Sequence, residues 1–192
     1  TGERTVAGGT QHTIHFTGSV RLLPQPPQPA VAQEPAVAEQ PATDGTPTLA
    51  PAQVYRLYFH GPAYQVVGSA WRHGDGVAAR FRAGLPAQAD VPTLIGPRLV
   101  ELCFQAAGLW EAGHEDRLAL PLHVDAVRLA TAEPVEDGDL VATARPNGRG
   151  GFDCVVRRDG RVVLWLDGYR TVPLPDPLPE DVSAPIRAVV RG

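Results

Sequence analysis

Glu101 and Gln105 are the residues of this chain whose types and spacing best suit acid–base chemistry. They stand four positions apart in an apolar stretch, residues 96–111, where Pro97 fits the first position of a helix because its missing N–H would have no intrahelical partner there. Side chains at i and i+4 share one helix face, so the two are expected to point together. A carboxyl group facing an apolar cavity has a raised pKa and can hold a proton near neutral pH. The pair therefore predicts a general acid, Glu101, with an amide neighbour.

The same stretch has a second, purely structural interpretation. Apolar residues spread around the predicted helix, which indicates burial: Leu99, Val100, Leu102, Cys103, Phe104, Leu109 and Trp110. The remaining residues form one narrow stripe, which would suit the single solvated edge of a core helix: Arg98, Glu101, Gln105, Gly108 and Ala112. The pattern alone leaves both interpretations open.

Composition excludes several classes of function. The 192 residues carry a net charge of −4 without a run of basic residues, so nothing favours a nucleic-acid partner. No apolar run approaches the roughly 20 residues that span a bilayer, so no membrane segment is expected. Cys103 and Cys154 lie in apolar surroundings without metal-ligand spacing, which indicates small core residues and fits a cytoplasmic location. No metal site, phosphate-binding loop or dinucleotide-binding pattern is present, so no cofactor is expected.

Hydrophobic patterning predicts an α+β domain. Residues 11–23 alternate as a strand does, and residues 24–51 are rich in Pro and Ala and predict a semi-rigid linker. Strands are then expected at 63–71, 76–81, 118–129, 140–145, 152–157 and 162–172, with a tight hairpin at Asp159-Gly160. Residues 174–192 are Pro-rich and predict a poorly ordered tail. One long buried helix with five or six antiparallel strands implies a sheet that wraps the helix.

Four segments, in order, resemble the C-terminal half of a polyketide synthase dehydratase domain. Residues 58–65 (Tyr-Phe-His-Gly-Pro-Ala-Tyr-Gln) are similar to the family's Gly-Pro turn, and residues 97–108 are similar to its Pro-x-Leu-Leu-Asp-x-x-x-Gln helix. Residues 120–129 resemble the Leu-Pro strand that follows, and 166–173 resemble the closing hairpin. The resemblance spans about residues 54–173, and residues 15–22 look like the last strand of the family's N-terminal half.

The resemblance implies a hotdog fold, a long helix wrapped by an antiparallel sheet, forming the second half of a double hotdog. On this view residues 1–23 end a preceding half, 24–51 link the halves, and 52–173 are the C-terminal hotdog. The chain, which starts without Met, would be part of a larger multidomain synthase that dimerises. The tunnel between the halves would be lined from this side by these residues: His60, Gly61, Pro62, Tyr64 and Leu102.

The family's reaction removes water from a β-hydroxyacyl thioester carried on the phosphopantetheine arm of acyl carrier protein, without another cofactor. A His of the first half removes the α-proton, and the helix carboxyl protonates the departing hydroxyl. Carried over, Glu101 would be the acid and Gln105 its orienting partner. Two groups poised on either side of a short substrate segment supply the reaction by positioning and proton transfer.

Two features depart from the family pattern. The helix acid is Glu101 where Asp is usual, a form similar to that of iterative polyunsaturated-fatty-acid and enediyne synthases. The His-x-x-x-Gly-x-x-x-x-Pro loop that carries the family's base is absent, and His60 in a Gly-Pro turn suits packing at least as well as catalysis. We therefore expect this chain alone to be inactive. The alternative is a dehydratase-like module that binds carrier protein or an acyl chain, or that dimerises and spaces neighbouring domains.

Overall fold

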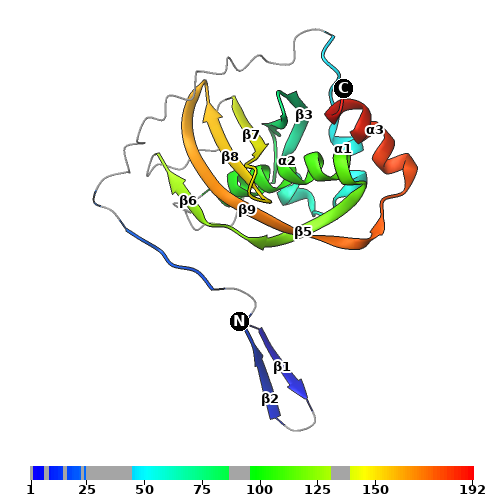
Figure 1. Cartoon of the computed structure of the whole chain (residues 1–192). Coiled ribbons are helices and arrows are strands. Elements are labelled where there is room, and N and C mark those ends of the chain that lie inside the picture. Colours follow the sequence, from blue (N-terminus) through cyan, green and yellow to red (C-terminus); the bar gives the residue numbers. More distant parts are fainter. Residues whose placement is uncertain are drawn as a thin grey trace.

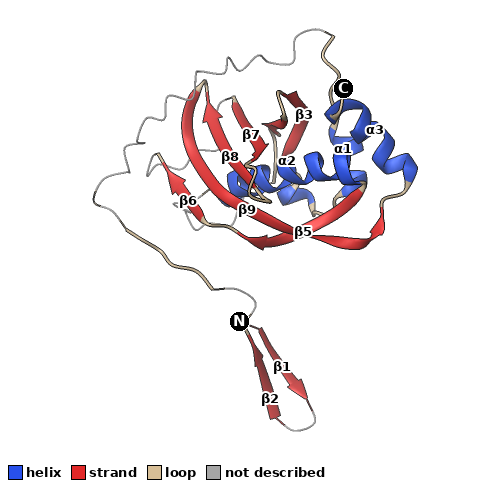
Figure 2. Ribbon diagram, viewed as in Figure 1, coloured by secondary structure: helices blue, strands red, loops and turns tan. Residues whose placement is uncertain are grey.

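The computed structural model of the chain describes residues 2–6, 9–14, 17–22, 24, 45–86, 96–130 and 139–192. Its main body is one long helix enclosed by an antiparallel sheet (Figures 1 and 2). The helices are α1 (Pro51–Leu57), the short 3₁₀ turn η1 (Pro62–Tyr64), α2 (Pro97–Glu115) and α3 (Glu180–Val190). The strands of the body are β3 (Val67–His73), β4 (Gly76–Phe81), β5 (Arg117–His123), β6 (Ala126–Leu129), β7 (Leu140–Pro146), β8 (Phe152–Arg158) and β9 (Arg161–Pro177).

Within the described ranges, these seven strands form a single sheet in the order β3-β4-β7-β8-β9-β5, and β6 also pairs with β9. Every pairing is antiparallel. The sheet curves around α2, which runs across its concave side (Figure 1). The predicted α+β class is confirmed, and the helix-in-sheet architecture is that of a hotdog fold.

Helix α2 is the centre of the core. Gly96 caps its start, Pro97 occupies the first turn, and the helix ends at Asp116, whose φ of 55° places it in the left-handed region. The predicted solvated edge is wrong: Arg98 and Gln105 are buried, as are the other members of that stripe apart from the partly exposed Glu101. The polar groups of this stripe must therefore find partners inside the protein. Tyr55 of α1 and Tyr58 after it contact the middle of this stripe, and Arg98 donates to the backbone carbonyl of Pro86.

Strand β9 holds the sheet together because it changes partners along its length. Its first part pairs with β8 and β6, and its last part, through Pro177, pairs with β5. The bend falls at Gly168, which has a φ of 61° and donates its N–H to Asp153 Oδ1 over 2.9 Å. A glycine with positive φ inside a strand allows such a change of direction. The strand predicted at 118–129 is likewise divided, into β5 and β6.

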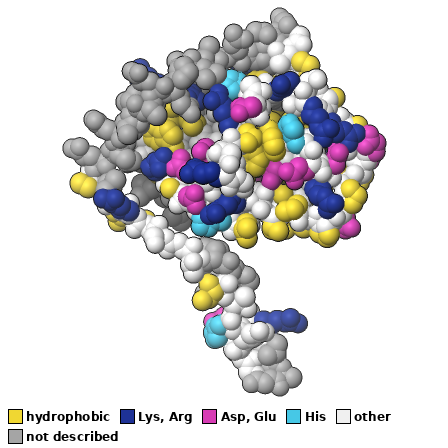
Figure 3. Space-filling view, viewed as in Figure 1, with side chains coloured by type: hydrophobic (Ala, Val, Ile, Leu, Met, Phe, Trp, Pro, Cys, Tyr) yellow, Lys and Arg dark blue, Asp and Glu magenta, His cyan; other side chains and the backbone are white. Residues whose placement is uncertain are grey.

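The C-terminal residues are ordered, which corrects the prediction of a poorly ordered tail at 174–192. β9 extends to Pro177, and α3 then packs against the C-terminal half of α2, with Ile186 fully buried. A Cβ on Gly113 of α2 would lie 2.8 Å from Val190 Cβ, so the two helices meet closely. Acidic and basic side chains lie next to one another on the side where α3 lies (Figure 3). The prolines of the tail obscured a helical spacing of apolar residues.

The N-terminal residues also differ from expectation. β1 (Gly2–Val6) and β2 (Gly9–Thr13) form a separate hairpin, and residues 17–22 are exposed without regular structure instead of continuing a strand. His15, Phe16 and most of the predicted linker (25–44) lie outside the described residues. The end of that predicted linker belongs to the fold, because Leu49 is fully buried and exchanges backbone hydrogen bonds with Ala70. None of the helices described combines the length and hydropathy needed to span a bilayer.

Candidate active site

Glu101 and Gln105 contact each other on one face of α2, as their spacing predicts. Gln105 Nε2 donates to Glu101 Oε1 over 2.9 Å and to the backbone carbonyl of Tyr64 over 2.8 Å. Gln105 Oε1 accepts from the Tyr55 hydroxyl over 2.9 Å. Both amide hydrogens and the amide oxygen thus have partners within the protein, which they need because Gln105 is only 1% exposed. The orientation of the amide is therefore fixed, with its nitrogen toward Glu101.

Two tyrosines that sequence analysis did not single out hold Gln105 from the other side. The hydroxyl of Tyr55, in α1, accepts a hydrogen bond from the backbone N–H of Val67 over 2.6 Å and donates one to Gln105 Oε1. Tyr58, just after α1, donates to the backbone carbonyl of Gln105 over 2.7 Å. The signal that could have revealed α1 is its apolar spacing, since Val54, Leu57 and Tyr58 recur at i, i+3 and i+4 and are all buried.

His60 also reaches Glu101. Its Nε2 lies 2.9 Å from Glu101 Oε1, and the two side chains are 23% and 18% exposed. The imidazole stacks on Phe59 with an interplanar angle of 3° and meets Tyr58 edge to face. The backbone carbonyl of His60 accepts from Gln65 Nε2 over 3.1 Å. The sequence predicted that His60 lines the acyl tunnel. In the structure its imidazole contacts the carboxyl group of Glu101, the candidate acid.

The surroundings of Glu101 favour its protonated form. Burial raises the pKa of Glu101, and the hydrogen bond from Gln105 and the proximity of His60 partly oppose that rise. Burial also raises the pKa of Tyr55 and of Tyr58, so both stay neutral phenols that can donate hydrogen bonds. The arrangement is a mostly buried carboxyl in a fixed orientation, which is what a general acid requires.

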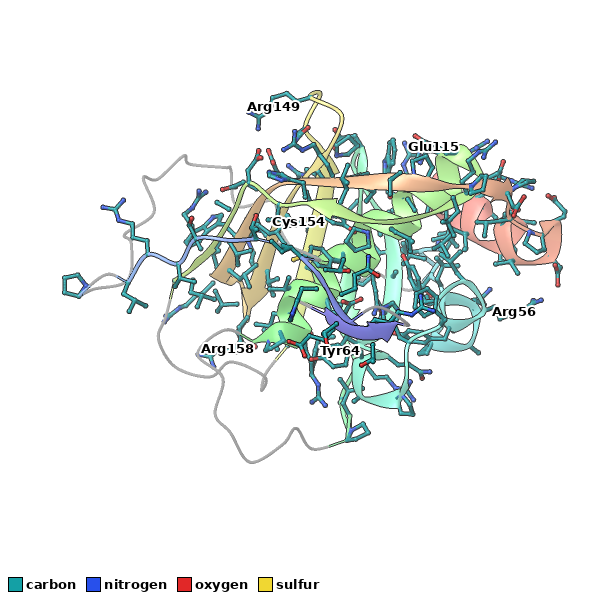
Figure 4. All side chains as sticks on the ribbon, turned by 90° about the horizontal axis from the view of Figure 1, so that it is seen from below. Arg56, Tyr64, Glu115, Arg149, Cys154 and Arg158 are labelled. Carbon is teal, nitrogen blue, oxygen red and sulfur yellow. The ribbon has the colours of Figure 1, made fainter. Side chains whose placement is uncertain are left out.

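The other predicted site residues lie nearby but contribute differently. Gly61 and Pro62 are exposed at the start of η1. Tyr64 lies beside α2 (Figure 4), is 40% exposed, and reaches Gln105 through its backbone carbonyl. Leu102 is fully buried in the core. The role of these residues in an acyl tunnel stays a prediction.

Two further described histidines and the two cysteines have other neighbours. His114 stacks on Trp110, and His123 lies 2.9 Å from Asp125 on the surface. Cys103 of α2 and Cys154 of β8 are buried and unbridged, as expected of core residues. Figure 4 labels Cys154. In the part of the chain that the structure describes, no group of three or more His, Cys, Asp or Glu side chains has the arrangement of a metal site.

Residues 27–181 match the family model described as "Polyketide synthase dehydratase N-terminal domain". This chain belongs to the polyketide synthase dehydratase family. The description names an N-terminal domain, whereas the sequence of residues 97–108 predicted the second half of a dehydratase domain; the assignment to one half stays a prediction. No curated protein sequence matches the chain significantly.

Solved dehydratase domains share the fold. A structure titled "Crystal structure of fusion DH domain" is 21% identical over 73% of this chain and 51% of that one, with a TM-score of 0.51. The dehydratase domain of the CurK module of curacin polyketide synthase is 14% identical over 66% and 48%, with a TM-score of 0.53. A trans-AT polyketide synthase dehydratase domain from Brevibacillus brevis is 17% identical over 66% and 48%, with a TM-score of 0.51. The chain thus spans about half the length of these dehydratase domains.

Proposed function

We propose that this chain is the second hotdog half of a dehydratase domain and supplies the acid for elimination of water from a β-hydroxyacyl thioester on acyl carrier protein. The observation that carries the proposal is the Glu101 carboxyl, which is mostly buried, has a raised pKa, and accepts a hydrogen bond from the amide of Gln105. That amide is held in place by two further partners, the backbone carbonyl of Tyr64 and the hydroxyl of Tyr55. Gln105 is the orienting residue.

The chemistry follows from these residue types. A hydroxyl leaves poorly unless it is protonated, so the acid must meet it as the C–O bond breaks. A base takes the α-proton, the electrons of the C–H bond form the C=C bond, and the C–O electrons leave with oxygen. Glu101 delivers its proton to that oxygen, and the products are water and an enoyl thioester. Holding the groups in place makes the step effectively unimolecular.

The partners in the proposal come from the family resemblance. The base is a His of the other dehydratase half, the substrate is attached through phosphopantetheine, and the domain needs no further cofactor. The parent synthase dimerises and works in the cytoplasm. Glu101 in place of the usual Asp assigns the chain to the subgroup similar to iterative polyunsaturated-fatty-acid and enediyne synthases.

The test uses the full-length product of the gene that encodes this chain, incubated with β-hydroxyacyl carrier proteins of several chain lengths. Intact-mass analysis is expected to show loss of one water, and Glu101→Gln is expected to abolish it. Glu115→Gln, the same change at an exposed position of α2, is the matched control and should leave dehydration intact. Dehydration that persists in Glu101→Gln, or its absence in the unaltered protein with every chain length, would refute the assignment.

A further inference from the structure

We propose that His60 is a positioning residue for the acid: its Nε2–H donates to Glu101 Oε1 and, together with Gln105, keeps the transferable proton on Oε2. This inference rests on the proposed role of Glu101 as the acid. It gives His60 a role different from that of a tunnel wall and from that of the base.

Side-chain nitrogens of Gln105 and His60 both contact the same oxygen of Glu101. Gln105 Nε2 and His60 Nε2 each lie 2.9 Å from Glu101 Oε1. The amide nitrogen of Gln105 is identified by the backbone carbonyl of Tyr64, which can only accept a hydrogen bond and lies 2.8 Å from Nε2. The amide oxygen then faces Tyr55 and accepts its hydroxyl proton. Oε1 is therefore an acceptor. Oε2 has no hydrogen-bond partner among the residues that the structure describes, so it is the oxygen left to carry and deliver the proton.

The surroundings of the imidazole favour the tautomer that carries its proton on Nε2. His60 Nδ1 is buried and has no hydrogen-bond partner within the described residues. A buried N–H without an acceptor is costly, so a proton on Nδ1 is disfavoured. The titratable neighbours are Glu101 on α2 and the neutral phenol of Tyr58. Arg82 is linked to His60 only through Gln65, whose Oε1 accepts a hydrogen bond from Arg82 over 3.2 Å.

The same contact argues against His60 as the base. Elimination requires the base at the α-proton and the acid at the β-hydroxyl, with the H–Cα–Cβ–O segment of the substrate between them. A direct hydrogen bond between His60 and Glu101 leaves no space for that segment. The ring is instead held in place by Phe59 stacked on it, by Tyr58 at its edge, and by Gln65 at its backbone carbonyl.

The test compares His60→Gln, His60→Asn and His60→Phe in the full-length protein. Gln can place an N–H donor near the position of the imidazole Nε2, whereas Asn is too short and Phe has no donor. We expect His60→Phe and His60→Asn to lower kcat by about 10-fold or more with little change in KM. His60→Gln should retain most of the kcat of the unaltered protein. Loss of a donor to the carboxylate raises the pKa of Glu101. The alkaline limb of the pH–kcat profile should therefore move to higher pH in His60→Phe and His60→Asn but not in His60→Gln.

A readout independent of turnover separates this inference from the proposed function. The carboxyl of Glu101, followed by NMR in protein labelled at glutamate carbons and assigned with Glu101→Gln, should titrate at higher pH in His60→Asn than in His60→Gln. Equal kcat, pH limb and titration in the Gln and Asn variants would overturn the role of His60 while leaving Glu101 as the acid. Dehydration that survives Glu101→Gln would instead overturn the proposed function, and the titration would still test the hydrogen bond.

Discussion

The Tyr55 hydroxyl donates to Gln105 Oε1 over 2.9 Å, linking α1 to the middle of α2. The oxygen of the Tyr55 hydroxyl also accepts a hydrogen bond from the backbone N–H of Val67, at the start of β3, over 2.6 Å. One phenol thus connects two helices and the sheet at the residue that orients Glu101. The candidate site therefore depends on a helix that carries no motif of its own.

Tyr55→Phe should lower both stability and the activity of the complete domain. The change leaves the Val67 N–H and Gln105 Oε1 without this partner, and a buried polar group left unpaired costs about 1–3 kcal/mol. We expect a loss of about 2 kcal/mol in the free energy of unfolding, measured by urea denaturation. Tyr64→Phe is the control, because its ring is 40% exposed and its hydroxyl has no hydrogen bond among the described residues. Equal losses in the two variants would contradict the role given to Tyr55.

Gly108→Ala should be destabilising, and Tyr58→Phe should rescue it. An added Cβ would lie 2.5 Å from the Tyr58 hydroxyl oxygen but 3.5 Å from its ring carbon Cζ, which is an ordinary contact. The single change should cost about 1–3 kcal/mol by overpacking, despite the better helix propensity of Ala. In the double variant the clash is absent, so the losses should be less than additive by at least about 1 kcal/mol. Strict additivity in a denaturation cycle would show that the hydroxyl is not the obstacle.

Glu111→Gln should stabilise the protein increasingly as pH rises. Glu111 Oε1 accepts a hydrogen bond from the Thr171 hydroxyl, while its buried Oε2 has no partner among the described residues. Burial raises the pKa of this carboxyl. A raised folded-state pKa contributes stability below the unfolded value, near 4.5, which is lost as pH rises through the folded value. The Tm of the variant relative to the unaltered chain should therefore increase between pH 4 and pH 8, as measured by calorimetry. A difference independent of pH would exclude this explanation.

Ile186→Ala should cost about 2–5 kcal/mol, because Ile186 is fully buried where α3 meets α2. Ala188→Ser, on the exposed face of the same helix, should change stability by about 0.5 kcal/mol or less. Chemical denaturation of both variants measures the difference. If Ile186→Ala were as mild as the control, the C-terminal helix would not be part of the cooperative unit.

Sequence patterning predicted the elements whose signals are local and periodic. Helix α2, strands β4, β7 and β8, and the turn at Asp159-Gly160, both with positive φ, follow from spacing and turn chemistry. The tail was misjudged because proline content masked the recurrence of Val182, Ile186 and Val189. The strand predicted at 11–23 ended at Thr13, because alternation cannot show whether another strand lies beside it to pair with.

Part of the candidate site could also be predicted. The contact between Glu101 and Gln105 follows from helix geometry, since residues four apart share a face. The contacts from Tyr55 and His60 join positions 50 and 41 residues away from their partners on α2, and only the folded topology brings them together. No spacing rule along the chain encodes such tertiary contacts.

The length of β9 has a consequence for how the protein is made. Strands β5 and β6 are synthesised before the segment 161–177, yet both hydrogen-bond to it. A nascent chain that has not released β9 from the ribosome therefore leaves β5 without its partner and α2 uncovered along that side. Completion of the sheet must wait until residues 161–177 have been translated and released. A pause before that point would lengthen the time during which the apolar faces of α2 require protection by a chaperone.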